Sequence, residues 1–457
     1  MDKEFNSNYG NWEFYKGALA IGVPVMLQSL LQSLVNLIDS FMVSGLGDIK
    51  MSGVNISGQI LFVFMVLMNS ICMSGGIFLT QFFGANDKDG MKQCFAFKLI
   101  ATLIMGGLYL YVTFGIPRQV ISLMVIGNSQ AKEILEFGQQ YMRLMGFAGF
   151  QMSISAIIAS SYREIGKVKI PLVITVSAAL LNSFLNWVLI YGHYGMPRFE
   201  VKGAAYATII TRTIEMLVYI VFILYDKPDF IGFSVFNKIN WKLFRRIIKK
   251  GSLLVISQMM WVLSESLTVA VYNSRGGANV VSGMAASFSI ANLFFVAFDG
   301  INTATGVIIG KSLGSNNLDR ALVEKKWMLF GAKVFGFFMT LLGFATVGLV
   351  PVVFGRLSLE AQTITKHMVM IIALFMPLWT YVNAQMAISK AGGDTKVCML
   401  VDGGITLVMI PLLLIMGTFT TWSPIIMYVV VKMLDIIKII LAGHELKKNR
   451  WVVNLSC

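Results

Sequence analysis

The stretch GVPVMLQSLLQSLVNLIDSFMVSGLG, residues 22–47, decides the fold of this chain. About 20 consecutive apolar residues can cross a lipid bilayer as a helix, and this stretch is longer than that. It carries Pro24 near its beginning and one carboxylate, Asp39, among apolar neighbours. A charge at the centre of a lipid-exposed helix costs about 2.5–3.5 kcal/mol on insertion scales. The pattern therefore predicts that Asp39 faces a protein interior or a water-filled path and has a function there.

Eleven more apolar segments accompany this one. With 56% hydrophobic and 13% charged residues, the 457-residue chain has the composition of an integral membrane protein. Each segment is long enough for a transmembrane helix, and none shows the alternation of a membrane barrel. The sequence predicts an all-α integral membrane protein with twelve transmembrane helices, near 15–43, 53–80, 94–115, 135–160, 168–192, 203–225, 250–273, 282–310, 327–352, 364–388, 397–417 and 424–445.

The positive charges predict the orientation. Most of the 37 Lys and Arg residues lie at the two ends and in the even-numbered connections. The positive-inside rule then places both termini in the cytoplasm, and we expect a multi-pass protein of the cytoplasmic (inner) membrane without a cleaved signal peptide. The net charge of +14 follows from this topology, so we expect no nucleic-acid partner. The four cysteines match neither a disulfide framework nor a metal site.

The two halves of the chain repeat. The segment SGVNISGQILFVFMVLMNSICMSGGIFLTQFFGANDKD, which begins at Ser52, aligns without a gap with SGMAASFSIANLFFVAFDGINTATGVIIGKSLGSNNLD, which begins at Ser282, 230 positions later. In this alignment Asn86 meets Asn316. A later pair, YREIGKVK and SKAGGDTK, aligns with a slightly different offset. Both copies are predicted on the same side of the membrane, so the repeat is parallel.

The repeat predicts two six-helix lobes. The largest polar interruption, residues 226–250, lies between two sets of six spans. We expect an N-terminal lobe at 1–225 (spans 1–6), a cytoplasmic linker at 226–250 and a C-terminal lobe at 251–457 (spans 7–12). Transporters built from parallel repeats place their site between the lobes and alternate access by rocking them.

Four motifs together resemble the multidrug and toxic compound extrusion (MATE) family of efflux transporters. These are LIDSFMVSGLG in the first span, QFFGAND and GKSLGSNN after spans two and eight, and KAGGDTK after span ten. The resemblance covers essentially the whole chain. It implies twelve helices in two lobes and the export of organic, often cationic, compounds coupled to Na⁺ or H⁺.

The resemblance also implies a cation and proton site in the N-terminal lobe. In the family, the first-span carboxylate, here Asp39, joins polar residues of spans five and six. Span five offers Asn182 and Asn186, which are four residues apart and share one helix face. Span six offers Ala204 and Thr208, one turn apart. Such oxygen ligands suit Na⁺ or a proton. The alternative is that the two asparagines only form hydrogen bonds between helices.

Glu265 in span seven is the second candidate. The 230-residue shift places it opposite Val35, one turn before Asp39. The resemblance implies a carboxylate partner in span ten, but that span supplies only neutral groups, among them Tyr381 and Asn383. A complete cation site in the C-terminal lobe is therefore in doubt. We expect Glu265 with these residues to bind cationic substrate or to form a secondary cation site, with a structural pairing as the alternative.

Other charged residues carry less information. Arg212 and Glu215 are spaced for an ion pair on one helix face, although Arg212 could instead reach Asp39. For Asp299 and Asp402 the sequence leaves two roles open: an interaction between helices, or a position facing the cavity. The segment TGVIIGKS at 305–312 is one residue short of a phosphate-binding loop and lacks the strand that precedes one, so we reject it. The three histidines offer no metal cluster, and we expect no metal beyond Na⁺ at the Asp39 site.

The sequence thus predicts a secondary antiporter that exports organic cations in exchange for Na⁺ or H⁺ by rocking of two lobes. We expect no enzymatic activity, no cofactor, and a monomer whose partners are its substrates and the lipid bilayer. A lipid-linked saccharide flippase of the same superfamily is the alternative; it should show a cavity lined with several arginines. A membrane enzyme would need clustered histidines or paired carboxylates, and a pore would need a selectivity motif.

Overall fold

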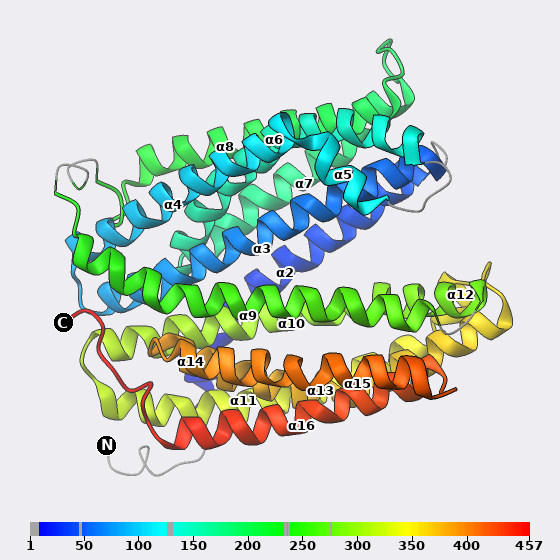
Figure 1. The fold of residues 1–457 in the computed structure, drawn as a ribbon. Helices are drawn as coiled ribbons and strands as arrows, with labels where there is room; N and C mark the ends of the chain where they lie inside the picture. The colour runs from blue at the N-terminus through cyan, green and yellow to red at the C-terminus, as the bar shows by residue number, and fades with distance from the viewer. Residues whose placement is uncertain (1–8, 45–47, 126–130, 233–234, 236–237, 275–276) are drawn as a thin grey trace. The chain divides into compact units, whose positions relative to one another are not determined.

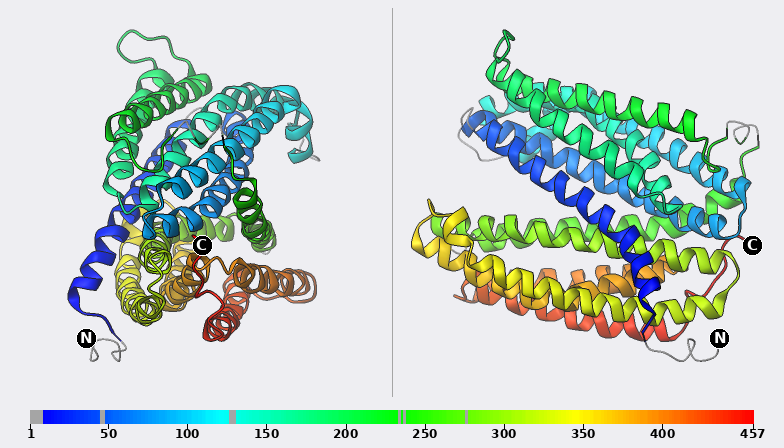
Figure 2. Two further views of the ribbon diagram at one scale, coloured as in Figure 1. Left: turned by 90° about the vertical axis from the view of Figure 1, so that its left-hand side faces the viewer. Right: turned by 180° about the vertical axis from the view of Figure 1, so that it is seen from behind.

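The computed structural model describes the chain except residues 1–8, 45–47, 126–130, 233–234, 236–237 and 275–276, so the last three residues of the opening stretch lie outside it. The described part is helical and contains no strand. Eleven helices in that part are long and apolar enough to cross a membrane. In each of two compact units, the long helices run side by side (Figures 1 and 2). The chain is a multi-pass membrane protein.

Each predicted span corresponds to a helical segment. The long helices are α2 (Trp12–Ser44), α3 (Asp48–Gly84), α4 (Lys88–Gly115), α6 (Ala131–Glu164), α7 (Lys169–Tyr191), α8 (Glu200–Asp226), α9 (Trp241–Asn273), α10 (Ala278–Gly314), α11 (Leu318–Val347), α13 (Leu359–Ala391) and α16 (Pro424–Lys447). The eleventh span is continuous from α14 (Thr395–Cys398) through the π-helix η2 (Met399–Gly403) to α15 (Gly404–Phe419). Two short helices, α5 (Pro117–Met124) and α12 (Val350–Val353), join longer ones.

The predicted twelfth span, 424–445, forms α16, but this helix does not count among the eleven apolar ones. The reason is its charge, because Lys432, Asp435 and Lys438 interrupt the apolar sequence. The fold class, an all-α membrane protein with a parallel internal repeat, is confirmed.

Turns at equivalent positions show the repeat in the backbone. Asn86, after α3, and Asn316, after α10, both have a left-handed conformation, with φ of 55° and 59°. Asparagine tolerates this region better than most residues because its short side chain can form hydrogen bonds locally. In the later pair of motifs, Gly166 and Gly393 have φ of 80° and 71°. The same residue types therefore reverse the chain at the corresponding places in both halves.

The KAGGDTK turn is tied to the start of α9. The Lys250 ammonium donates a hydrogen bond to the carbonyl oxygen of Gly393, 2.6 Å away. The next residue, Asp394, lies between α13 and α14. Burial raises the pKa of the Asp394 carboxyl group, and the positive charge of Lys250 opposes this effect.

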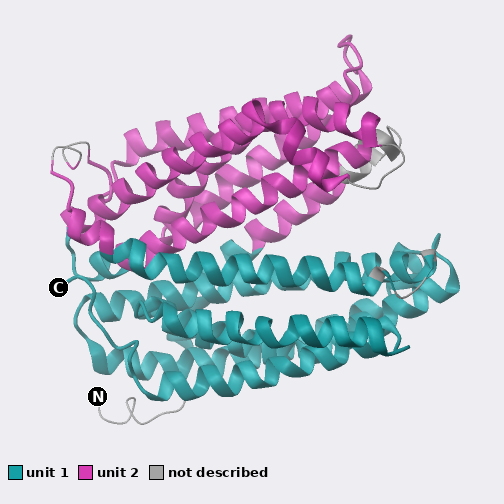
Figure 3. Ribbon diagram, in the orientation of Figure 1, with its two compact units in different colours: residues 1–26, 80–87, 246–457 teal, residues 27–79, 88–245 magenta. Residues whose placement is uncertain are grey.

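The two compact units interleave along the chain (Figure 3). One comprises residues 1–26, 80–87 and 246–457, and the other residues 27–79 and 88–245. We call them unit 1 and unit 2. The predicted lobes are continuous stretches instead, so the boundaries at 226–250 stay a prediction, and α9 already begins at Trp241 within that predicted linker.

Unit 1 has a large apolar core between α9, α10, α13, α15 and α16. Its buried members include Met368, Met376, Trp379, Met427 and Tyr428. Smaller clusters stabilise unit 2, for example Ile121, Ile134 and Met142; Phe64, Met68 and Tyr109 form another.

Within unit 1, the end of α3 crosses the end of α10 at very short range. A Cβ atom on Gly84 would overlap the carbonyl of Lys311, and one on Gly314 would overlap the carbonyl of Gln81. The repeat relates these two contacts, since each glycine lies 230 positions from the other. Only glycine permits this approach of two backbones.

Candidate functional site

Asp39 and the two asparagines of span five lie together in unit 2. Asp39 is in the second-last turn of α2, and Asn182 and Asn186 lie on one face of α7. The Asn186 amide donates a hydrogen bond of 2.7 Å to Asp39 Oδ1. It also approaches Asn182 Oδ1 at 3.3 Å. Both asparagines are buried. The structure thus brings together three of the five residues predicted for the cation site.

The two residues from span six lie beside this group on α8. Ala204 is buried in a small apolar cluster with Ile190 and packs against Met42, which lies three residues after Asp39 on α2. The Thr208 hydroxyl donates to the Ala204 carbonyl oxygen at 2.9 Å. Ala204 therefore does not offer a carbonyl free of hydrogen bonds. The hydrogen bond of Thr208 stays within α8.

Two polar atoms at the site have no hydrogen-bond partner among the described residues. They are Asn186 Oδ1 and Asn182 Nδ2, and both are buried. A buried acceptor without a partner costs about 1–3 kcal/mol, so such atoms are characteristic of a place where a ligand or water binds. The oxygen of Asn186 lies on the same amide group that binds the Asp39 carboxylate. A cation held by Asp39 would find this second oxygen within the same group of side chains.

A second polar network in unit 2 surrounds Glu215. The Arg212 guanidinium forms an ion pair with Glu215 Oε2 at 2.7 Å, which is the pairing that the spacing predicts. Thr175 donates to Glu215 Oε1 at 3.3 Å, and Gln28 of α2 donates to Thr175 at 3.1 Å. The charge of Arg212 is therefore balanced within its own helix.

Sequence reasoning missed a buried ion pair in unit 2. The Lys98 side chain is fully buried, and its ammonium donates to Glu164 Oε2 at 2.5 Å. It also donates to the hydroxyls of Ser160 and Ser161 at 3.1 and 3.2 Å. A Cβ on Gly76 would overlap the Glu164 carboxylate. The adjacent glycines of α3, Gly75 and Gly76, which lie against Lys98 and Glu164, are the signal in the sequence that could have located this pair.

In unit 1, the partner of Glu265 comes from α16 and not from the tenth span, where a partner was expected. Lys432 of α16 has its ammonium 3.8 Å from Glu265 Oε1. The same ammonium lies over the rings of Trp379 and Tyr428, at 5.6 and 5.4 Å from their centroids. The signal in the sequence was Lys432 and Asp435, three residues apart and therefore on one helix face.

The charges continue along α16. Asp435 accepts a hydrogen bond of 2.8 Å from the indole of Trp379 and lies 3.3 Å from the ammonium of Lys438. Lys438 also lies 3.6 Å from Asp402 in the π-helix. Asp402 is thus paired between helices, one of the two roles left open for it. Glu265, Lys432, Asp435, Lys438 and Asp402 form a series of alternating charge, which we call the unit 1 charge series.

The other two residues predicted with Glu265 have different contacts. The Tyr381 ring lies 4.7 Å from the ammonium of Lys333 on α11. The Asn383 amide donates to the Trp379 carbonyl at 2.9 Å, and its oxygen accepts from Asn302 at 3.4 Å. None of these described contacts joins Tyr381 or Asn383 to Glu265.

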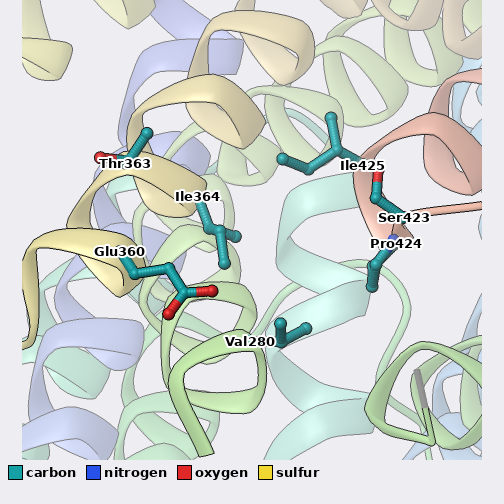
Figure 4. A pocket seen from close by; sticks show the side chains of 7 residues that line it. All are labelled: Val280, Glu360, Thr363, Ile364, Ser423, Pro424 and Ile425. Carbon is teal, nitrogen blue, oxygen red and sulfur yellow. The ribbon is translucent and has the colours of Figure 1, made fainter. Parts of the chain in front are cut away.

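A separate pocket of about 480 Å³ opens at the ends of α10, α13 and α16. It is lined by Val280, Glu360, Thr363, Ile364, Ser423, Pro424 and Ile425. Figure 4 shows the Glu360 carboxylate pointing toward Val280. Glu360 accepts a hydrogen bond from Asn279 at 2.8 Å. No residue predicted for a site lines this pocket. The described residues also hold no cluster of His, Cys, Asp and Glu suited to a metal ion.

Comparisons with known proteins agree with this architecture. The MatE family model matches residues 24–188 and 254–415. The "Probable multidrug resistance protein NorM" of Thermotoga maritima is 24% identical over 321 residues, which are 69% of this chain and 68% of that protein. The "Multidrug export protein MepA" of Staphylococcus saprophyticus is 27% identical over 222 residues, 48% of this chain and 47% of that protein.

Among solved structures, one described as "Crystal structure of MATE in the straight conformation" superposes with a TM-score of 0.85 at 18% identity. The superposition covers 95% of this chain and 96% of that one. At this identity the likeness shows the fold. The two matched segments of the family model fall one in each half of the repeat and together include most of the chain. The chain belongs to the MatE family.

Proposed function

We propose that the chain is a secondary antiporter that exports organic cations across the cytoplasmic membrane in exchange for Na⁺ or H⁺. Family membership and the names of the relatives, a multidrug resistance protein and a multidrug export protein, support the efflux of varied compounds. The lobes would rock to alternate access, as in other transporters with parallel repeats.

The observation that carries the coupling proposal is the hydrogen bond between Asn186 and Asp39. A carboxylate within an apolar helix is costly unless it binds something, and this one is held by a buried amide whose oxygen has no partner among the described residues. Asp39 would supply the one negative charge that balances Na⁺ or accepts a proton. The oxygens of Asn182, Asn186 and Thr208 would replace water around a bound Na⁺.

The Asn186 amide and the Asp39 carboxylate would couple ion binding to a change of conformation. The Asn186 amide fixes the direction of the Asp39 carboxylate by donating to one of its oxygens. Binding of a cation or a proton at that carboxylate removes the uncompensated charge. A state of the protein that buries the neutral site more deeply would then become favourable, and ion binding would shift the population between states.

Several further proposals accompany this one. Both termini lie in the cytoplasm, with residues 1–225 and 251–457 as the two moving lobes. Asp39, Asn182 and Asn186 come from one chain, so the site needs no partner subunit, which supports a monomer. The contact between Glu265 and Lys432 favours the structural pairing of Glu265 over a role in binding cationic substrate, and Tyr381 and Asn383 remain proposed substrate contacts. No cofactor or catalytic activity enters the scheme.

Uptake into proteoliposomes tests the proposal. Purified protein is reconstituted, and entry of a fluorescent organic cation is measured under a Na⁺ gradient and, separately, under a pH gradient. We expect one of the two gradients to drive uptake in the wild-type protein and neither to drive it in Asp39→Asn. Uptake that depends on neither gradient would refute cation coupling.

The flippase alternative is not favoured by any described contact. Such a protein needs several arginines in its cavity to hold phosphate groups. Arg212 is already paired with Glu215 at 2.7 Å, and Arg143 is exposed on α6.

A further inference from the structure

Helix α16 of unit 1 carries an ammonium group within an aromatic cage. Lys432 lies in the middle of this helix, and its side chain is only 18% exposed. Its ammonium lies within 6 Å of the centroids of both the Trp379 and the Tyr428 rings. At this range the negative face of an aromatic ring attracts a cation, most strongly for tryptophan. Two such rings around one ammonium group form a site that can bind a cation.

The cage is held by contacts that do not involve Lys432. Trp379 stacks on Phe375 at 5.7 Å between centroids, and its indole donates to Asp435 at 2.8 Å. Tyr428 is 1% exposed and packs edge-to-face against Tyr272, with centroids 6.2 Å apart. Because these rings are fixed by their own neighbours, we expect the cage to persist if the lysine side chain is removed.

The carboxylate that forms an ion pair with the ammonium in the cage is that of Glu265. Its oxygen lies 3.8 Å from the Lys432 ammonium, longer than the 2.7–2.9 Å typical of a charge-assisted hydrogen bond. The attraction is therefore mainly Coulombic, and the lysine is held by charge and ring faces together. Asp435 is already engaged by Trp379 and Lys438. In addition, the buried hydroxyl of Tyr272 has no hydrogen-bond partner among the described residues.

We propose that Glu265, Trp379 and Tyr428 form a binding site for a primary alkylammonium ion, and that the Lys432 side chain is its resident ligand. The site is filled by the protein's own cation, so a free ammonium compound binds there only when Lys432 is shortened. This inference concerns binding in unit 1 and does not depend on coupling at Asp39.

Chemical rescue tests the site. Lys432→Ala keeps Cβ and removes three methylene groups and the ammonium, which together correspond to n-propylammonium. The melting temperature of the purified full-length protein in detergent is measured with increasing n-propylammonium chloride. The variant should melt below the wild-type protein and recover in a saturable way, with half-saturation on the order of 10 mM, an affinity typical of a small ligand. Equal concentrations of 1-propanol or NaCl should not restore it, and wild-type protein should not respond.

Lys438→Ala is the matched control. Lys438 belongs to the same helix and the same charge series, but its described partners are carboxylates, Asp402 and Asp435. This variant should lose stability without rescue by n-propylammonium. Adding Glu265→Gln to Lys432→Ala should abolish the rescue, because the cage then loses the carboxylate that pairs with the ammonium.

Three results would overturn the proposal. One is a folded Lys432→Ala protein that does not respond to n-propylammonium, and another is an equal response of Lys438→Ala. The third is a rescue that survives Glu265→Gln. If Lys432→Ala does not fold in detergent, Lys432→Met fills the space of the stem up to Cε without a charge, and it is tested with the ammonium ion, which replaces Nζ alone. A folded Lys432→Met protein without a saturable response would contradict the proposal equally.

Discussion

Asp39→Asn separates the charge of the candidate coupling site from its shape. The amide has nearly the same size as the carboxylate, and its oxygen can still accept the 2.7 Å hydrogen bond from Asn186. The variant should therefore fold and insert like the wild-type protein. What it loses is the single negative charge at the site, and with it the ability to balance Na⁺ or to release a proton at ordinary pH.

The size of the loss follows from Coulomb's law. At a separation of about 4 Å and an effective dielectric constant of about 20, a carboxylate attracts a monovalent cation by about 4 kcal/mol. Each 1.4 kcal/mol corresponds to about tenfold in affinity, so Asp39→Asn should weaken ion binding by about three powers of ten. Transport driven by either gradient should then fall to background at ordinary ion concentrations.

The assay is uptake of a fluorescent organic cation by proteoliposomes that contain equal amounts of each variant. Glu265→Gln serves as the control, because it makes the same chemical change on α9, the helix that the repeat relates to α2. We expect this control to keep its dependence on the driving ion. The reasoning is refuted if Asp39→Asn transports like the wild-type protein, or if only Glu265→Gln loses the ion dependence.

Three more outcomes are expected. Asn186→Ala removes the amide oxygen that would bind Na⁺, a contact with a charged group worth about 1.5–3 kcal/mol, and should raise the Na⁺ concentration for half-maximal uptake by about ten- to a hundredfold. If H⁺ is the coupling ion the sign reverses, because the lost N–H donor stabilised the ionised Asp39 carboxylate; an unchanged ion dependence would exclude the amide from the site. Lys98→Met leaves the Glu164 carboxylate without its buried partner, which should cost about 3–5 kcal/mol of stability and appear as a lower melting temperature. A melting temperature equal to that of the wild-type protein would show that the pair is not needed for stability. A cysteine at position 195 should react with an impermeant reagent from outside intact cells, whereas one within 226–250 should react only after the membrane is opened; the reverse pattern would overturn the proposed orientation.

The candidate coupling site could be predicted in part because its pieces are local. Asn182 and Asn186 share a helix face by their spacing alone, and the structure places Asp39 against the second of them. The role of Ala204 was not predictable in detail. Whether its carbonyl is free depends on the rotamer of Thr208, which donates to it within the helix.

The sequence by itself determined the helices and the repeat. The length of each apolar segment is enough to require a helix in a bilayer, since an unpaired backbone cannot remain in lipid. The shift of 230 residues was also visible in the sequence, and Asn86 and Asn316 indeed adopt the same left-handed turn. These features depend on neighbours along the chain, so no distant contact was needed to infer them.

Only the tertiary structure decided which charges on different helices are paired. Glu265 lacks an acidic partner in span ten, and its partner is Lys432, 167 positions later on another helix. Tyr381 contacts Lys333, Asn383 donates to the Trp379 carbonyl, and Lys98 is buried against Glu164. The sequence of an apolar helix with a few charged residues does not show whether a charge faces lipid, water or another helix. The packing of the helices sets the direction in which a charged side chain points. A charge can be buried only where a second helix supplies the opposite charge or the face of an aromatic ring.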